Sequence, residues 1–215
     1  MSVQSLTRRE KQQQTRKSLL RAATKLFCKR GLEGASIDEV AQAAGYTKGA
    51  FYANFKSKEE LFLVMLDERF SSELERLDAT LAGSGDKHAE AAAAATDFIH
   101  FAGDGEWPKL YFQFAAHAAR NEEFREELAT RMKAMRTRIS EIIARWQQSY
   151  GVKPGLPVEA VTAMICFMAD GFLVDRMIEP DLSEDLYTTM VGVFLRGLAA
   201  MAEEQDTAEP HGAAS

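Results

Sequence analysis

Residues 47–58, with the sequence TKGAFYANFKSK, combine hydrogen-bond donors with aromatic rings at helical spacing. Lys48, Gly49 and Tyr52 would share one face of a short helix, because residues three or four positions apart lie together on a helix surface. A lysine can donate to guanine O6 and N7, and a tyrosine ring can contact a thymine methyl group. Glycine at this face would let the helix backbone come close to the bases. The face is suited to reading base edges in DNA.

The polar residues that flank this face are better placed for phosphate oxygens than for bases. They are Thr47, Asn54, Lys56 and Lys58. Backbone N–H groups at the start of the next helix would add further donors. Ahead of the first helix, Arg8, Arg9 and Lys11 form a basic arm within residues 1–12. This arm either contacts DNA or is an unstructured tail, and the sequence leaves both open.

The charge of the chain is divided in the same way. Residues 1–58 contain 12 Lys and Arg against 4 Asp and Glu, a net charge of +8. The remainder contains 14 basic and 28 acidic residues, a net charge of −14. A basic head joined to an acidic body indicates that only the head approaches a polyanion.

Two short helices joined by a tight turn must position the Lys48 face. Ser36 and Glu39 have the spacing of a capping box, and Ile37, Val40 and Ala44 follow at helical intervals. Gly45 is placed to end this helix in the left-handed conformation, and Thr47 can cap the next one. The pattern predicts a helix-turn-helix, with a third helix over 48–55 that turns Phe51 and Phe55 inward.

The rest of the chain favours an all-α fold of about nine helices, since it contains few prolines and no alternating apolar strands. The expected domains are a helix-turn-helix head at 1–58, a larger helical bundle at 59–204 and a disordered tail at 205–215. The expected helices are 12–30, 37–44, 48–55, 58–81, 88–102, 108–119, 122–150, 158–178 and 184–204.

Several other kinds of protein are disfavoured. No apolar run predicts a signal peptide or a membrane span, so we expect a cytoplasmic protein. Cys28 and Cys166 have no metal or disulfide spacing, and the four histidines have no helical partner at i+3 or i+4. We therefore expect no metal and no cofactor. The chain also lacks a nucleophile–base constellation, which argues against an enzyme.

Residues 15–66 closely resemble the DNA-binding head of TetR-family transcriptional regulators, above all in the segment AGYTKGAFYANFKSKEEL. The resemblance implies base contacts at Lys48, Gly49 and Tyr52, and phosphate contacts at Thr47, Asn54 and Lys58. It also implies a C-terminal domain that binds a ligand and dimerises. Two heads related by a two-fold axis would meet the half-sites of a palindromic operator, with repression as the expected outcome.

The last two long helices carry apolar stripes that suit the implied four-helix dimer interface, although the helix over 158–178 could use part of its stripe for the core of its own subunit. The expected interface residues are Val161, Met164, Ile165, Met168, Phe172, Met190, Val193, Phe194, Gly197, Leu198 and Met201.

Aromatic and sulfur-containing side chains between 98 and 172 could line an apolar pocket between helices, although many would be ordinary core. The candidates are Phe98, Phe101, Trp107, Tyr111, Phe114, His117, Met135, Phe167 and Asp170. His117 and Asp170 are the best polar candidates because each interrupts an apolar run.

Three functions stay open at this point. The favoured one is a dimeric repressor that a small, largely apolar molecule releases from DNA. The second is a dimeric DNA-binding regulator without such a ligand. The third, less favoured, is an all-α enzyme that uses His117 and Asp170 as acid and base.

Overall fold

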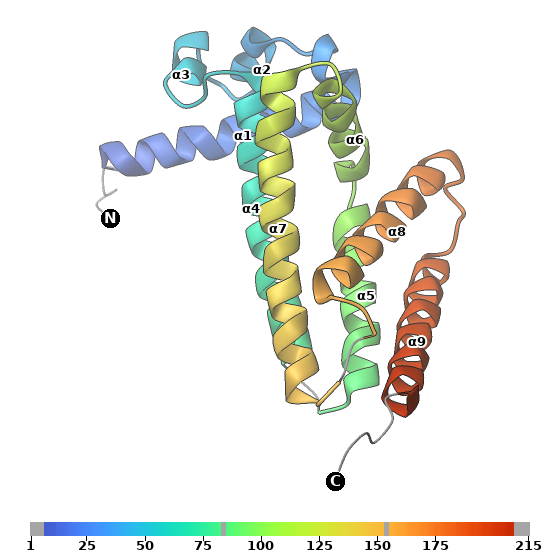
Figure 1. The fold of residues 1–215 in the computed structure, drawn as a ribbon. Coiled ribbons are helices and arrows are strands. Elements are labelled where there is room, and N and C mark those ends of the chain that lie inside the picture. The colour runs from blue at the N-terminus through green and yellow to red at the C-terminus, as the bar shows by residue number, and fades with distance from the viewer. Residues whose placement is uncertain (1–6, 83–84, 153–154, 209–215) are drawn as a thin grey trace, which may run out of the picture. The chain divides into compact units, whose positions relative to one another are not determined.

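The chain is entirely helical over the residues described by the computed structural model, which are 7–82, 85–152 and 155–208. Nine helices lie in this part and no strand occurs in it, which confirms the all-α prediction (Figure 1). They are α1 (Arg8–Gly34), α2 (Ile37–Ala43), α3 (Lys48–Tyr52), α4 (Lys58–Leu81), α5 (Lys87–Gly103), α6 (Trp107–Ala118), α7 (Glu122–Ser149), α8 (Val158–Ile178) and α9 (Glu184–Ala208).

The chain divides into two compact units, and the boundary falls inside α4 and α7. Unit 1 comprises the chain up to Arg69 together with Gly105–Ala129, and unit 2 comprises Phe70–Asp104 and the chain from Thr130 onward. The expected head ended at residue 58, so unit 1 also takes up the start of α4, all of α6 and the start of α7.

An aromatic cluster explains this enlargement of the head. The Phe62 ring of α4 stacks on the Phe114 ring of α6 with centroids 3.7 Å apart, and Phe27 of α1 meets Phe114 edge-on at 5.9 Å. Phe124 of α7 adds a further ring to the cluster. Phe27, Phe62 and Phe114 are fully buried, so α6 is part of the same hydrophobic core as α1.

The first helix begins earlier than expected. Thr7 and Glu10 form a capping box, in which the Thr7 amide donates to Glu10 Oε2 at 2.7 Å and the Glu10 amide donates to Thr7 Oγ1 at 3.3 Å. Arg8, Arg9 and Lys11 therefore lie on α1 and not on a flexible arm. The Thr-x-x-Glu signature was present in the sequence. Residues 1–6 of the expected arm lie outside the described residues.

Unit 2 packs α5 against α8 and α9, and α8 against α9. The far ends of α4 and α7 share a core with α5, formed by Leu77, Leu81, Phe101, Met135, Ile139 and Ile142. The buried Glu90 carboxylate ties α5 to α7, since it accepts from Trp146 Nε1 at 2.8 Å and from the Tyr150 hydroxyl at 2.9 Å. These bonds fix the position of the Trp146 indole.

The chain is helical further into its C-terminal end than expected. A disordered tail was predicted over 205–215, but α9 continues to Ala208. Residues 209–215 lie outside the described residues, as do Gly83 and Ser84 of the loop after α4 and Pro154 of the loop after α7.

Candidate functional site

The helix-turn-helix is built by three local devices that the sequence encodes. The Ser36 hydroxyl and the Glu39 carboxylate cap α2 reciprocally, with the Ser36 amide 2.9 Å from Glu39 Oε2. Gly45 ends α2 with φ 80°, in the left-handed region where glycine is favoured. Thr47 then caps α3 by accepting from the Ala50 amide at 3.3 Å. These three predictions are confirmed.

The inner side of α3 is anchored in the core of unit 1. Phe51 is fully buried and Phe55 is 1% exposed, as expected. The Arg16 guanidinium of α1 lies 4.5 Å from the centre of the Phe55 ring and donates to the Asn54 carbonyl oxygen at 3.0 Å. Arg16 thus closes the C-terminal end of α3, where a helix leaves carbonyl groups unsatisfied.

The outer side of α3 presents Thr47, Lys48, Gly49 and Tyr52 to solvent. Tyr52 is 51% exposed, and its ring rests edge-on against Phe51. The Lys48 ammonium donates to Asp38 Oδ2 of α2 at 3.0 Å, in an ion pair whose two side chains are both exposed. This hydrogen bond raises the pKa of Lys48. The cation expected at the base edges is therefore held by a carboxylate of the neighbouring helix.

Gly49 is not required by the fold of unit 1. A Cβ atom placed there would meet only Thr47 Oγ1, at an ordinary contact distance of 3.7 Å. Glycine inside a helix is less stable than alanine by about 1 kcal/mol, so this position carries a cost without an internal reason. A side chain at Gly49 would instead add bulk to the outer face of α3.

The flanking polar residues divide into two kinds. The Lys56 side chain is exposed to solvent, so its ammonium group can reach a phosphate. Asn54 is half-buried, and its amide nitrogen donates to the Ala50 carbonyl at 2.8 Å, so this side chain is directed at α3 itself. Lys58 donates to the carbonyls of Leu32 and Ala35, at 2.6 and 3.1 Å, which leaves one ammonium hydrogen for a phosphate.

Models of two parts of one protein family match the chain. Residues 19–65 match the model described as bacterial regulatory proteins, tetR family, and residues 101–200 match the model of the BetI-type transcriptional repressor, C-terminal. Together they cover about two thirds of the chain. The chain belongs to the TetR family of transcriptional regulators. It is a DNA-binding regulator with a helix-turn-helix.

Individual relatives are similar mainly in the head. The transcriptional regulator AcrR of Shigella flexneri is 44% identical over 59 residues, which is 26% of this chain and 27% of AcrR. The regulator YfiR of Bacillus subtilis is 22% identical over 165 residues, covering 74% of this chain and 78% of YfiR. The chain therefore spans only about a quarter of AcrR, although it spans most of YfiR.

Solved structures share the fold over nearly the whole chain. A TetR-family regulator from Mesorhizobium loti has a TM-score of 0.69 at 18% identity and covers 93% of this chain and 96% of its own. The regulator FadR of Bacillus subtilis, solved in complex with stearoyl-CoA, also has a TM-score of 0.69 at 18% identity. The match covers 86% of this chain and 98% of the FadR chain. At this identity the likeness concerns the fold alone.

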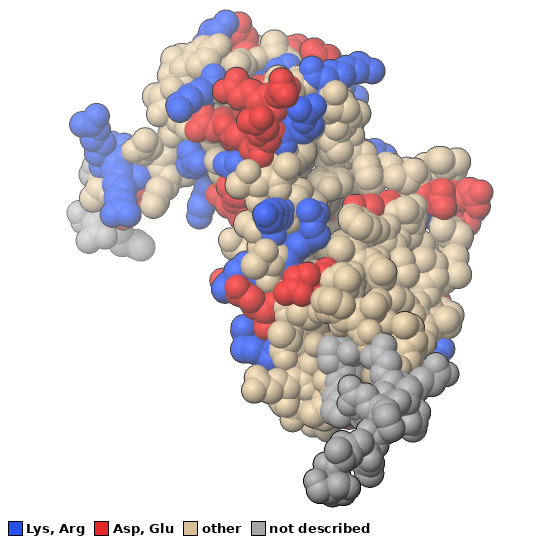
Figure 2. Space-filling model, viewed as in Figure 1, with Lys and Arg blue, Asp and Glu red and all other residues tan. Residues whose placement is uncertain are grey.

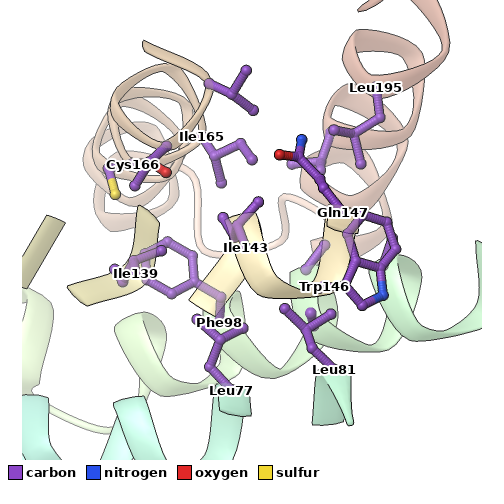
Figure 3. A pocket seen from close by; sticks show the side chains of 16 residues that line it. Leu77, Leu81, Phe98, Ile139, Ile143, Trp146, Gln147, Ile165, Cys166 and Leu195 are labelled. Carbon is purple, nitrogen blue, oxygen red and sulfur yellow. The ribbon is translucent and has the colours of Figure 1, made fainter. Parts of the chain in front are cut away.

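Unit 2 of this TetR-family chain contains a cavity of about 90 Å³ (Figure 3). All five helices of the unit contribute to its wall. Phe98 is the one expected ligand residue that lines it. Sequence reasoning missed most of the lining residues, which include Leu77, Leu81, Ala91, Ala94, Ile139, Ile143, Trp146, Gln147, Thr162, Cys166 and Leu195. These are mainly aliphatic residues, and only the fold distinguishes them from ordinary core.

Four other expected ligand residues lie in unit 1 and not at this cavity. They are Trp107, Tyr111, Phe114 and His117. Phe114 is in the aromatic cluster, and Trp107 stacks on Phe62 with centroids 5.9 Å apart. The two ring nitrogens of His117 lie 3.6 Å from Glu33 Oε1 and 3.2 Å from Glu59 Oε1. These side chains are occupied with packing and charge contacts inside unit 1.

The remaining expected ligand residues lie in unit 2 but outside the cavity wall. Phe101 and Met135 belong to the buried core. Phe167 is 62% exposed, because it lies on the outer side of α8. Asp170 is half-buried on α8, and burial raises its pKa to about 6 while Arg136 opposes the shift.

The expected dimer residues fall on two sides of α8 and α9. Val161 and Ile165 face the cavity, and Phe172 and Leu198 are buried within the chain. Ile165, Met168, Met190 and Phe194 are half-buried. The exposed members are Met164, Val193, Gly197 and Met201.

The exposed apolar surface of unit 2 extends beyond the residues expected from the sequence. Almost all large exposed apolar side chains of the described residues lie on α8 and α9, and this surface includes Phe167, Val174, Met177, Ile178 and Leu186. Figure 2 shows the face over these two helices as largely uncharged, with acidic residues near the α8–α9 connection. A patch of this kind is typical of a protein contact.

Within the described residues, no helix has the length and apolar character needed to cross a membrane. No group of three or more His, Cys, Asp or Glu side chains in that same part of the chain is arranged to hold a metal ion.

The Asp38–Lys48 ion pair leads to a prediction about DNA affinity. Asp38→Asn frees the Lys48 ammonium and removes a negative charge beside it. We expect binding to random-sequence duplex DNA to tighten roughly two- to fivefold. The slope of log K against log salt should steepen by up to about one. Fluorescence anisotropy at several salt concentrations measures both quantities. Glu123→Gln, which makes the same charge change at an exposed position of α7, is the control; equal effects of the two variants would contradict competition for Lys48.

The raised pKa of Asp170 leads to a prediction about stability. Because the folded pKa of about 6 exceeds the ordinary 3.8, the folded state binds more protons between these values. The stability due to protonated Asp170 is complete below pH 3.8 and is lost as pH rises through 6. The side chain of Asp170→Asn stays neutral at every pH. The change in the free energy of unfolding caused by this substitution should therefore be more favourable at pH 8 than at pH 5, by about 1–2 kcal/mol after allowance for partial exposure.

Urea unfolding at the two pH values measures this difference. Asp175→Asn, at an exposed position of the same helix, is the matched control, and its change between the two pH values is subtracted. A gain in stability from Asp170→Asn that is the same at pH 5 and pH 8 would mean that burial does not raise the pKa of the Asp170 carboxyl group.

Proposed function

We propose that the protein is a dimeric repressor that binds a palindromic operator through α3 and is released by a small, largely apolar ligand bound in unit 2. The head, residues 1–58, is the DNA-binding part, and the bundle from residue 59 onward is the regulatory and dimerisation part. The observation that carries the proposal is the outer face of α3, where Gly49 lies between an exposed lysine and an exposed tyrosine without an internal reason to be glycine.

The contacts proposed for α3 follow from exposure and chemistry. Lys48 and Tyr52 contact base edges, with Gly49 allowing the helix backbone to come close to them. Thr47 and Lys56 contact phosphates, and Lys58 adds its remaining hydrogen. Asn54 contributes mainly by holding the end of α3, since its amide nitrogen is bonded to Ala50.

The dimer is proposed through the exposed faces of α8 and α9. Met164, Phe167, Val174 and Ile178 are separated by three, seven and four positions, which is the spacing of a stripe along one side of a helix. Gly171 lies within this stripe, and Gly197 lies between Val193 and Met201 of α9. A Cβ atom at either glycine would meet no atom of its own subunit within 4 Å. Small residues in an apolar stripe allow the close approach of a partner helix, here one from a second copy of the chain.

A two-fold dimer explains why one short helix is sufficient for specific binding. Two α3 faces on one side of the dimer would meet half-sites separated by one helical turn of DNA, about 34 Å. The proposed ligand site is the cavity of unit 2. The FadR structure with stearoyl-CoA supports the proposal in that a protein of the same fold was solved with an acyl compound.

The DNA-binding face is tested by Gly49→Ala. Alanine should stabilise α3 by up to about 1 kcal/mol, because it is the better helix former and has room within the subunit. The same methyl group should lower operator affinity at least about tenfold, because it separates the helix from the base edges. Tyr52→Ala should lower the affinity to a similar extent by removing a base contact.

An operator selected from random duplexes supplies the probe for these measurements. Chemical denaturation gives the stability, and anisotropy gives the affinity. Lys29→Ala, at an exposed position of α1, controls for general loss of positive charge. Operator binding by Gly49→Ala and Tyr52→Ala that is as tight as that of the parent would refute the assignment of this face.

The dimer is tested by Phe167→Asp. A carboxylate in the centre of the α8 stripe would be buried without a partner in the dimer but solvated in the monomer. We expect the dimer dissociation constant to rise at least about a hundredfold. Sedimentation velocity at micromolar concentration measures the change, and circular dichroism verifies the fold. Tyr52→Asp places the same charge at an exposed aromatic position of unit 1 and should remain dimeric. A monomeric parent, or a dimeric Phe167→Asp variant, would contradict the proposed interface.

A further inference from the structure

The wall of the unit 2 cavity contains no Asp, Glu, Lys, Arg or His. Its sixteen residues are aliphatic or aromatic, apart from Gln147, Thr162 and Cys166. Burial raises the pKa of the Cys166 thiol to about 11, so this group is also uncharged at neutral pH. A charged molecule would lose its hydration on entering the cavity without gaining a counter-ion, which is costly in an apolar environment.

Two polar groups of the wall already have a partner inside unit 2. The Trp146 indole nitrogen donates to Glu90 at 2.8 Å, and that carboxylate is 3% exposed. The Thr162 hydroxyl accepts from Ser140 at 3.0 Å, in a pair that is buried. These bonds hold the wall together, and the Trp146 N–H is not available to a ligand without loss of its bond to Glu90.

Gln147 differs from Trp146 and Thr162. Its side-chain amide makes no hydrogen bond within the described part of the chain. Figure 3 shows this amide extending from α7 into the space between Ile165 of α8 and Leu195 of α9. A carboxamide offers both donors and an acceptor, so it can bond to a carbonyl, a hydroxyl or an amide of a ligand.

We propose that the cavity binds a small uncharged molecule, mostly hydrocarbon, whose single carbonyl, hydroxyl or amide group is hydrogen-bonded by Gln147. The inference rests on the proposed ligand response and narrows it to a chemical class. Gln147 determines specificity, because its carboxamide offers two donor hydrogens and an acceptor oxygen to the polar group of the ligand. A dry cavity of about 150 Å³ holds benzene, so the 90 Å³ cavity suits a chain of a few carbon atoms.

Three probes of nearly equal size separate charge from shape: pentanamide is neutral, pentanoate is an anion and hexylammonium is a cation. The chain has two tryptophans, and Trp146 lines the cavity whereas Trp107 lies in unit 1. In full-length Trp107→Phe, tryptophan fluorescence therefore reports on the cavity wall. Isothermal calorimetry on the unaltered chain provides a second measurement if this substitution disturbs unit 1.

We expect saturable binding of pentanamide and at least about hundredfold weaker binding of the two ions, because each would be desolvated without a partner. Gln147→Leu should weaken the binding of pentanamide about fivefold through loss of a hydrogen bond. It should not weaken the binding of pentane, a hydrocarbon probe that has no polar group. Gln148→Leu, at the exposed neighbouring position, should change neither affinity. Ala94→Leu, which narrows the cavity, should abolish binding of pentanamide.

The opposite results overturn the inference in separate ways. Binding of pentanoate or hexylammonium as tight as that of pentanamide would show that the cavity accepts charge. Equal effects of Gln147→Leu and Gln148→Leu on pentanamide binding would show that Gln147 does not bond to the ligand. Binding of pentanamide to Ala94→Leu that is as tight as binding to the parent would show that the probe binds outside the cavity. Absence of saturable binding by all three probes would refute a small neutral ligand. None of these outcomes affects operator binding or dimerisation, whose failure is detected by the Gly49, Tyr52 and Phe167 variants.

Discussion

Burial of Phe51 and Phe55 is the interaction on which the DNA-binding face depends. A helix of five residues is too short to be stable alone, because the cost of nucleation is not recovered over so few hydrogen bonds. The two phenylalanines fix α3 from within, and Arg16 of α1 covers the Phe55 ring and bonds to the end of the helix. The orientation of Lys48 and Tyr52 is thus set by side chains on the opposite side of α3.

Some glycines inside helices are not explained by the packing of the chain itself. Gly34 and Gly103 have little room, since a Cβ atom there would lie 3.3 and 3.4 Å from a neighbouring atom. Gly49, Gly171 and Gly197 have no positive φ, and a Cβ atom at any of them would make at most the ordinary contact of 3.7 Å that Gly49 has with Thr47. These three lie on the faces proposed to meet DNA and a second subunit. A side chain added at any of these three positions would be unfavourable only in the proposed complex with DNA or with a second copy of the chain.

The sequence predicted the helices well because their signals are local. Capping boxes, the Gly45 turn and the apolar spacing of Phe51 and Phe55 act over a few residues, and the structure has them as expected. The bounds of α4 and α8 were also predicted correctly. The missed start of α1 had a local signal as well, in Thr7 and Glu10.

The sequence could not predict which neighbour each apolar face would meet. Phe98 and Phe114 are the same type of residue and have similar neighbours in the sequence. Yet Phe98 lines the cavity, whereas Phe114 stacks on Phe62 in unit 1. On α8, Ile165 and Phe167 are two positions apart and point to opposite sides, one to the cavity and one to solvent. Periodicity indicates that a helix has apolar sides but does not assign them to a pocket, a core or a partner.

The two sides of α8 link the two proposed activities of unit 2. Val161, Thr162 and Ile165 contribute to the cavity wall, while Met164 and Phe167 belong to the exposed stripe. Because packed helices shift as rigid elements, a ligand that moves the inner side of α8 must also move its outer side. In the proposed dimer that outer side is the subunit contact. A ligand of a few carbon atoms could therefore act on the pair of subunits through one helix, provided that it binds one position of α8 better than another.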